Sequence, residues 1–184
     1  LTAPTLSLPW VPQANTQGRV VNVFGALTDP YGAGVGISGP EPGQHPPHLV
    51  GVGTFQPVER AFRLARQMNP ALRKVGVVWS PNESNSEACL HKARAVCQEL
   101  GIELFEANAG NTSEVPEAVR SLLARGVEAV WVGGDTVAIA SLGAIVSAAR
   151  AARVPVFTND PSDAANGALR SEERRVGKEC RSRW

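Results

Sequence analysis

Residues 74–86 read KVGVVWSPNESNS, and they hold the clearest strand–helix pattern in the chain. Its first six residues form a short, valine-rich apolar run, which is typical of a strand covered on both faces. Apolar side chains then recur at helical spacing up to the glycine at position 101, so the sequence predicts a helix over residues 84–100. Ser84 and Glu87 have the spacing of a capping box, which predicts that Ser84 caps this helix.

The strand–helix pattern repeats along the rest of the chain. Three further apolar runs occupy residues 102–107, 127–132 and 154–158, and the four runs start about 25 to 28 residues apart, which is the spacing of βαβ units. A helix that begins near Pro116 and a longer one over residues 136–153 fill the gaps. The sequence therefore predicts an α/β fold with a doubly wound parallel sheet.

The first half of the chain carries a weaker pattern. Residues 19–27 predict one strand, residues 31–48 are rich in glycine and proline and predict a loop, and residues 58–68 predict a helix. About 50 residues with one convincing strand cannot bury a core of their own. We interpret residues 1–56 as the residual part of a first lobe with its crossover, and residues 57–169 as a second α/β lobe.

Charge and composition limit the class of protein. The 184 residues include 18 basic and 17 acidic side chains, for a net charge of +1, and 43% are hydrophobic. This composition is ordinary for a globular protein and argues against a nucleic-acid partner. Residues 171–184 hold five basic and three acidic side chains, so the remainder carries 13 basic against 14 acidic ones, or −1. We expect residues 170–184 to be a non-native or disordered tail, with a native basic tail as the alternative.

Polar side chains follow the carboxyl ends of the predicted strands. In an open parallel sheet this edge binds ligands, because helix N-termini present free N–H groups there. Hydroxyl and N–H groups suit a solute carboxylate, and an acid such as Asp135 suits an ammonium group. The alternative for single residues is helix capping, since Ser84, Asp135 and Thr136 are capping residue types. For the edge as a whole, the sequence favours a binding face for a small polar molecule.

Other motifs carry little chemistry. The glycines of residues 32–36 do not complete a dinucleotide fingerprint, because its sixth position is isoleucine. His45 and His48 have no acidic or cysteine partners at metal-ligand spacing, which favours a solvated loop. Cys89 and His91 stand two apart on one predicted helix and so face different ways. We expect no catalytic residues, no metal and no cofactor.

At residues 74–86 the sequence resembles ABC transporter substrate-binding proteins of the tryptophan-binding type, in which a similar segment opens the second lobe. The resemblance covers roughly residues 19–169, and its specificity comes from the order and spacing of several motifs. The other matching stretches are residues 28–30 (TDP), 50–54 (VGVGT), 131–136 (WVGGDT) and 154–158 (VPVFT).

The resemblance implies a type I periplasmic-binding-protein-like architecture of two lobes, here with an incomplete first lobe. A solute, commonly an amino acid or a related molecule, is held in the cleft, and the closed form docks on a membrane permease. Ser80 and Gly134 depart from the family pattern, which has Asn and Thr there. The positions that match the cleft segments are Thr28, Asp29, Ser80, Asn82, Ser84, Asn85, Ser86, Asp135, Thr136, Asn159 and Asp160.

The resemblance also implies a non-enzymatic, periplasmic or extracytoplasmic protein, in many members a lipoprotein, and we expect a monomer. Because family members have an export signal and continue past residues 166–169, we expect this chain to be a truncated fragment. Two alternatives from other classes stay open. One is the ligand-sensing domain of a transcriptional regulator, which shares the two-lobed architecture, and the other is a Rossmann-like enzyme whose phosphate loop lies outside this sequence.

Overall fold

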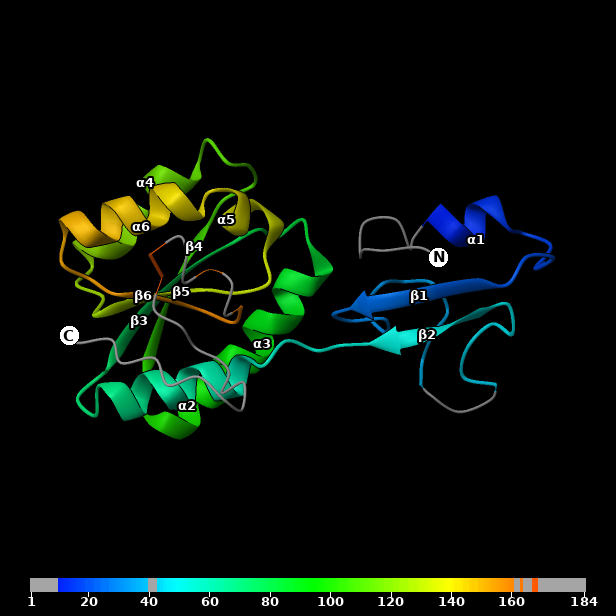
Figure 1. Cartoon of the computed structure of the whole chain (residues 1–184), viewed down its shortest axis with the longest axis horizontal. Coiled ribbons are helices and arrows are strands. Elements are labelled where there is room, and N and C mark those ends of the chain that lie inside the picture. The colour runs from blue at the N-terminus through cyan, green and yellow to red at the C-terminus, as the bar shows by residue number, and fades with distance from the viewer. Residues whose placement is uncertain (1–9, 40–42, 161–162, 164–166, 169–184) are drawn as a thin grey trace, which may run out of the picture.

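A computed structural model describes residues 10–39, 43–160, 163 and 167–168. The chain forms two units, each with its own parallel sheet. The smaller unit (residues 10–39 and 43–55) holds β1 (Asn22–Leu27) and β2 (Leu49–Gly53), and the larger unit (residues 57–160) holds a four-stranded sheet. Figure 1 shows the two units joined by the segment between β2 and the next helix. The predicted tail, residues 170–184, lies outside the described residues.

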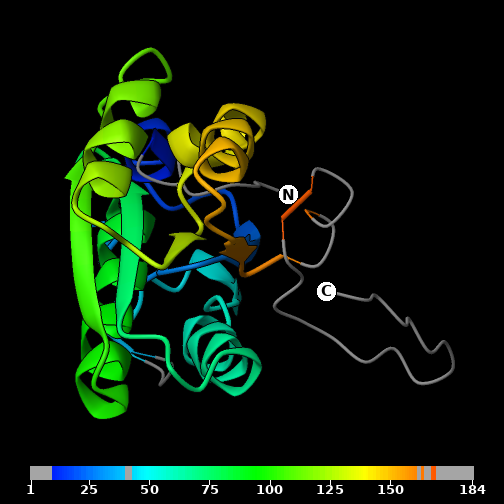
Figure 2. The ribbon, with the colours of Figure 1, turned by 90° about the vertical axis from the view of Figure 1, so that its left-hand side faces the viewer.

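The larger unit is a parallel sheet covered by helices on both faces. Its strands are β3 (Lys74–Trp79), β4 (Glu103–Asn108), β5 (Ala129–Val132) and β6 (Val156–Thr158), in the order β4-β3-β5-β6. One face is covered by α2 (Val58–Met68) and α3 (Ser84–Leu100). The other is covered by α4 (Val115–Ala124), α5 (Thr136–Ala140) and α6 (Leu142–Ala151). Figure 2 shows α6 and α2 on opposite sides of β6. None of the described helices is long and apolar enough to cross a bilayer.

The apolar strands divide their side chains between two cores, because successive side chains point to opposite faces of a sheet. Val78 and Val130 pack with the helices on one face, whereas Val77 and Trp131 pack with those on the other. In the second core the Phe62 ring lies edge-on against Trp131, with 5.0 Å between ring centroids. Burial on both faces explains why these strands read as continuous apolar runs.

The predicted elements agree with the structure, with three differences. The single helix predicted over residues 136–153 is divided into α5 and α6 at Ser141, whose carbonyl oxygen accepts the first hydrogen bonds of α6. The strand β2 was not predicted. The predicted capping box is wrong, because Glu83 occupies the N-cap position and Ser84 is the first helical residue.

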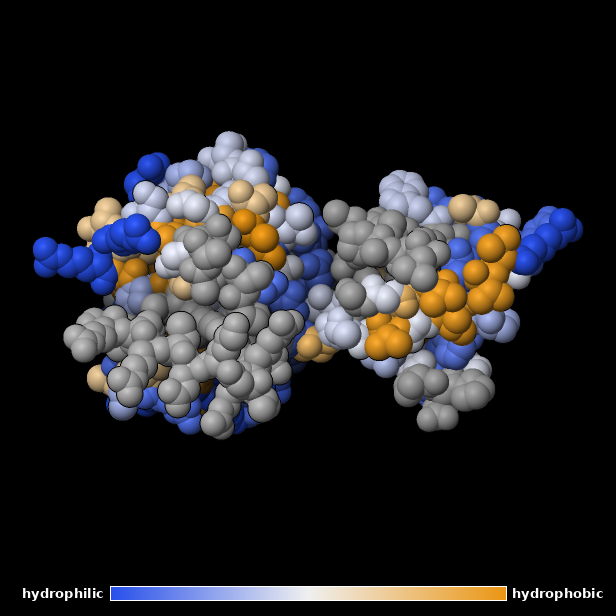
Figure 3. Space-filling view, viewed as in Figure 1, coloured by the Kyte–Doolittle hydropathy of each residue, from blue (hydrophilic) through white to orange (hydrophobic). Residues whose placement is uncertain are grey.

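The smaller unit leaves apolar side chains on its surface. Val20, Val23 and Val52 are 61%, 43% and 66% exposed, and Figure 3 shows apolar side chains gathered on this unit. Its core consists of Phe24, Leu49 and a few loop residues. Two strands cannot cover both of their faces, so an open apolar surface follows from the geometry. Gly51 lets β2 approach β1 closely, since a Cβ at this position would lie 2.2 Å from the Phe24 carbonyl oxygen.

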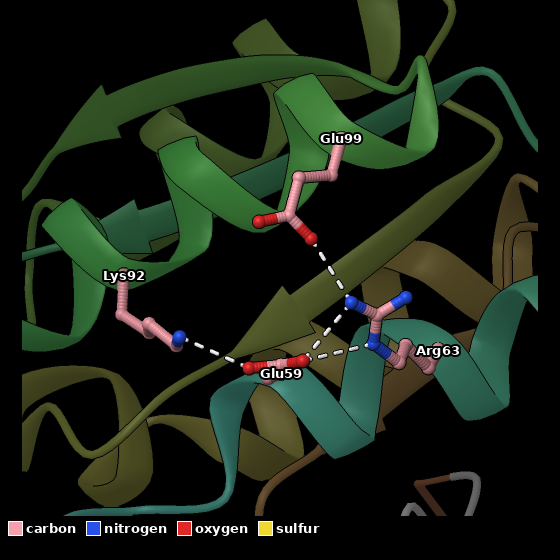
Figure 4. Close-up of polar contacts among 4 residues, drawn as sticks. All are labelled: Glu59, Arg63, Lys92 and Glu99. Atoms are coloured by element: carbon pink, nitrogen blue, oxygen red, sulfur yellow. Dashed lines mark hydrogen bonds and ion pairs between the residues drawn. The ribbon is translucent and has the colours of Figure 1, made fainter.

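An ion cluster ties α2 to α3 on the surface of the larger unit (Figure 4). Glu59 pairs with Lys92 and with Arg63, both at 3.0 Å, and Arg63 also reaches Glu99 at 2.9 Å. Hydrogen bonds and charge from Lys92 and then Arg63 hold the pKa of the Glu59 carboxyl below its ordinary value. The cluster therefore favours the ionised form of Glu59 in the folded state.

We expect Glu59→Gln to destabilise the protein slightly, in a way that depends on salt and pH. A carboxyl group whose pKa is lowered on folding contributes stability above its ordinary pKa and loses it as pH falls through the folded value. Urea unfolding should therefore show a gap between the variant and the parent at pH 7 that closes at pH 3 and in 1 M NaCl. Glu117→Gln, which removes an exposed pair with Arg120 within one helix, is the matched control. Equal stability of Glu59→Gln and the parent at pH 7 and low salt would contradict this role.

Candidate ligand-binding site

The carboxyl ends of β3, β5 and β6 bring most of the predicted site residues together. The strands are neighbours in the sheet, so the loops that follow them lie side by side. The side chains of Ser80, Asn85, Ser86, Asp135 and Asn159 are buried at this edge. Those of Asn82, Ser84, Thr136 and Asp160 are exposed there. Whether any of them contacts a ligand stays a prediction.

Asp135 is held by hydrogen bonds from within the chain. It is 2% exposed, and its Oδ2 accepts from the Ser80 N–H at 2.6 Å and from the Ser86 hydroxyl at 2.7 Å. Its Oδ1 accepts from the Ala138 N–H at 2.6 Å, which makes Asp135 the N-cap of α5. In this structure the carboxylate therefore fastens the loop after β3 to the loop after β5.

Glu83 makes a second link between the same two loops, and no sequence pattern predicts it. Its Oε2 accepts from the Thr136 N–H at 3.0 Å. Beside it, the Asn85 NH2 group donates to the Gly134 carbonyl oxygen at 2.6 Å. Glu83 is 9% exposed, although it lies in a polar loop. Two buried carboxylates thus set the relative positions of the exposed Ser84 and Thr136 hydroxyls.

The segment between the two units also reaches this edge. Asn159 donates its NH2 group to the Gln56 Oε1 at 3.0 Å, and its Oδ1 accepts from the buried Trp131 indole N–H at 3.0 Å. Gln56 was not among the predicted site residues. Its contact with a residue 103 positions later has no sequence signature.

Thr28 and Asp29 lie at the carboxyl end of β1, beside a hollow in the smaller unit. The arrows of β1 and β2 point toward the larger unit in Figure 1. The hollow has a volume of about 360 Å³, and an acidic group and aromatic rings share its lining. The lining includes Phe24, Thr28, Asp29, Tyr31, His45 and Phe55. Tyr31 and Phe55 are 53% and 49% exposed, so an apolar group entering the hollow meets rings that solvent can reach.

The Asp29 carboxylate is oriented by its own turn. Its Oδ1 accepts from the backbone N–H groups of Tyr31 at 3.1 Å and Gly32 at 3.0 Å. Such a turn directs a carboxylate without help from distant residues. Burial raises the pKa of the Cys89 thiol in α3 to about 11, with further contributions from the charges of Asp29 and Asp135.

Three side chains of α3 carry groups that can act as nucleophiles or bases, namely Cys89, His91 and Cys97. Cys89 is buried with a raised pKa, and burial raises the pKa of Cys97 to about 12, so both thiols are neutral near pH 7. His91 is exposed on the same helix as Cys89. Within the part of the chain that the structure describes, no three His, Cys, Asp or Glu side chains gather closely enough to hold a metal ion.

A family model described as ABC transporter substrate binding protein matches residues 15–176. The chain belongs to this family. The resemblance inferred from the sequence is therefore confirmed, and so is the fold class of a parallel α/β, periplasmic-binding-protein-like protein. The description of the family names a substrate-binding component of ABC transporters.

A relative and two solved structures are similar to this chain. A tyrosine-binding protein of Clostridioides difficile (strain R20291) is 23% identical over 147 residues, which is 80% of this chain and 41% of the relative. A conserved domain protein from Vibrio cholerae O1 biovar El Tor has a similar crystal structure, with a TM-score of 0.75 and 25% identity over 90% of this chain and 54% of that one. An ABC domain from Streptococcus pneumoniae in complex with L-Trp gives a TM-score of 0.70 at 21% identity, over 80% of this chain and 48% of that one. The chain thus spans about half the length of these relatives.

Proposed function

We propose that this substrate-binding family member is the solute-binding component of an ABC importer, and that it binds an amino acid, with an aromatic one favoured. The observation that carries the proposal is the aromatic hollow beside Asp29, placed at the strand ends that point toward the polar edge of the larger unit. A carboxylate suits the ammonium group of an amino acid, and exposed rings suit an aromatic side chain. The tyrosine-binding and L-Trp-bound relatives support this solute class.

In this proposal the solute lies between the two units. Thr28 and Asp29 contact it from the smaller unit, and the exposed hydroxyls of Ser84 and Thr136 face it from the larger one. Closure of the units around the solute would give the permease a form to recognise. We propose that the protein acts as a monomer outside the cytoplasm, where a lipid anchor is one way of holding it at the membrane.

The direct test is thermal unfolding and calorimetric titration of the chain with L-tyrosine and L-tryptophan. At a ligand concentration of 100 Kd, binding should stabilise the folded state by about 2.7 kcal/mol. Phe55→Ala should weaken binding about tenfold, because a ring at the hollow is lost. Met68→Ala is the matched control, since Met68 is also an exposed apolar residue, 41% exposed, but lies at the far end of α2. If none of the proteinogenic amino acids stabilised the chain, the proposal would be rejected.

A further inference from the structure

Gln56 belongs to the segment that joins the two units, yet its amide lies at the carboxyl edge of the larger sheet. It is partly buried and follows β2 by three residues. Its Oε1 accepts from the Asn159 NH2 group at 3.0 Å. Gln56 is therefore placed where residues from both units meet, next to the predicted site.

The direction of the Gln56 amide is fixed by a neighbour that can only donate. The Trp131 indole N–H has no acceptor capacity, and it donates to the Asn159 Oδ1 at 3.0 Å. Asn159 must then turn its NH2 group toward Gln56, and the Gln56 side-chain oxygen accepts the hydrogen bond. The indole is 1% exposed and packs edge-on against Phe62, so it is held in place. It follows that the Gln56 NH2 group points away from Asn159.

This NH2 group lies against Gly134, in the loop between β5 and α5. A Cβ at position 134 would lie 2.3 Å from the Gln56 Nε2, so the present arrangement requires glycine there. The neighbouring carboxylates of Asp135 and Glu83 are engaged by other donors. Among the described residues, none accepts a hydrogen bond from the Gln56 NH2 group.

We propose that Gln56 is a ligand-contacting residue, whose NH2 group donates a hydrogen bond to a carboxylate or carbonyl oxygen of the solute. This inference rests on the proposed function and adds a specificity residue to it. The hydrogen bonds from Trp131 to Asn159 and from Asn159 to Gln56 orient the Gln56 amide and leave its NH2 group at the edge of the site. Such an amide can donate to an acceptor without further ordering of its side chain. Gly134 provides the space, and Asn159 acts as a positioning residue through Gln56.

The test uses Gln56→Glu at pH 8, where the new carboxyl group is ionised. The variant keeps an oxygen for the Asn159 NH2 group, so the melting temperature without ligand should not change. It replaces the donor with a negative charge, so affinity for L-tryptophan should fall at least about tenfold. Tryptophanamide keeps the carbonyl oxygen without the charge, and tryptamine has neither. Tryptamine affinity should not fall. An equal loss of affinity for tryptophanamide indicates a contact with the carbonyl oxygen, and a loss for L-tryptophan alone indicates a contact with the carboxylate.

Further variants keep the test independent of folding. Gly134→Ala should displace the flexible Gln56 amide and lower tryptophan affinity as Gln56→Ala does, and the double variant should lose no more than either alone. Gln98→Glu adds the same charge at an exposed position of α3 and should bind normally. Unchanged affinity for tryptophan in Gln56→Glu, or an equal loss in Gln98→Glu, would overturn the inference. If the parent chain binds none of the proteinogenic amino acids, the proposed function fails first and this inference with it.

Discussion

Asp135→Ala is expected to lower the free energy of unfolding by about 3–5 kcal/mol, a large effect for a single substitution. The substitution leaves three donors without their acceptor, namely the N–H groups of Ser80 and Ala138 and the Ser86 hydroxyl. Asp135 is 2% exposed, so water does not replace the lost carboxylate easily. Loss of the N-cap of α5 adds to the cost. Urea unfolding at pH 7, followed by circular dichroism, measures the change.

Two other substitutions show whether the hydrogen bonds are responsible. Asp135→Asn keeps one acceptor oxygen but turns an NH2 group toward donors, and we expect about 2 kcal/mol of destabilisation. Thr136→Ala removes an exposed hydroxyl from the next residue and should cost less than about 0.5 kcal/mol. Equal stability of Asp135→Ala and Thr136→Ala would show that the Asp135 carboxylate does not fasten the two loops. The carboxylate would then be available to bind a ligand.

The strands and helices of the larger unit could be predicted because their signals are local. The helix over residues 58–68 and the strand over residues 74–79 have the predicted bounds, since each depends on a periodic pattern within its own segment. The strand β2 was missed because two of its five residues are glycine, which weakens any strand pattern. It forms by pairing with β1, where Gly51 allows a close approach to Phe24. A pairing between distant segments is not visible in either segment alone.

The location of the candidate site could be predicted, but not the state of its side chains. Parallel strands gather their carboxyl ends at one edge, so the adjacency of the loops containing Ser80, Asp135 and Asn159 follows from the fold class. Which oxygen atoms remain free depends on contacts between residues about fifty positions apart, such as Ser80 with Asp135. Glu83 looks like an exposed loop residue in the sequence, yet it is buried by its bond to the Thr136 N–H. Gln56 was missed for the same reason.

The two tryptophans at the carboxyl edge should respond differently to replacement by phenylalanine. Trp131 donates its indole N–H to Asn159 and is 1% exposed. Trp79 ends β3 with a buried indole N–H that has no acceptor among the described residues. Trp131→Phe leaves the Asn159 oxygen unpaired and opens a small cavity, so we expect about 2–4 kcal/mol of destabilisation.

Trp79→Phe removes an unpaired buried donor, whose loss offsets the lost packing, and the net change should lie within about 1 kcal/mol. Urea unfolding of both variants measures the difference, and comparable destabilisation of the two would show that ring volume outweighs hydrogen bonding here. The pair also tests the relay to Gln56. Without the indole donor, the Asn159 and Gln56 amides can reverse, so Trp131→Phe should lose affinity for L-tryptophan even where the protein remains folded, whereas Trp79→Phe should retain it. Because both substitutions remove an indole from the same edge, a difference in affinity between them would come from the direction of the amides rather than from ring size.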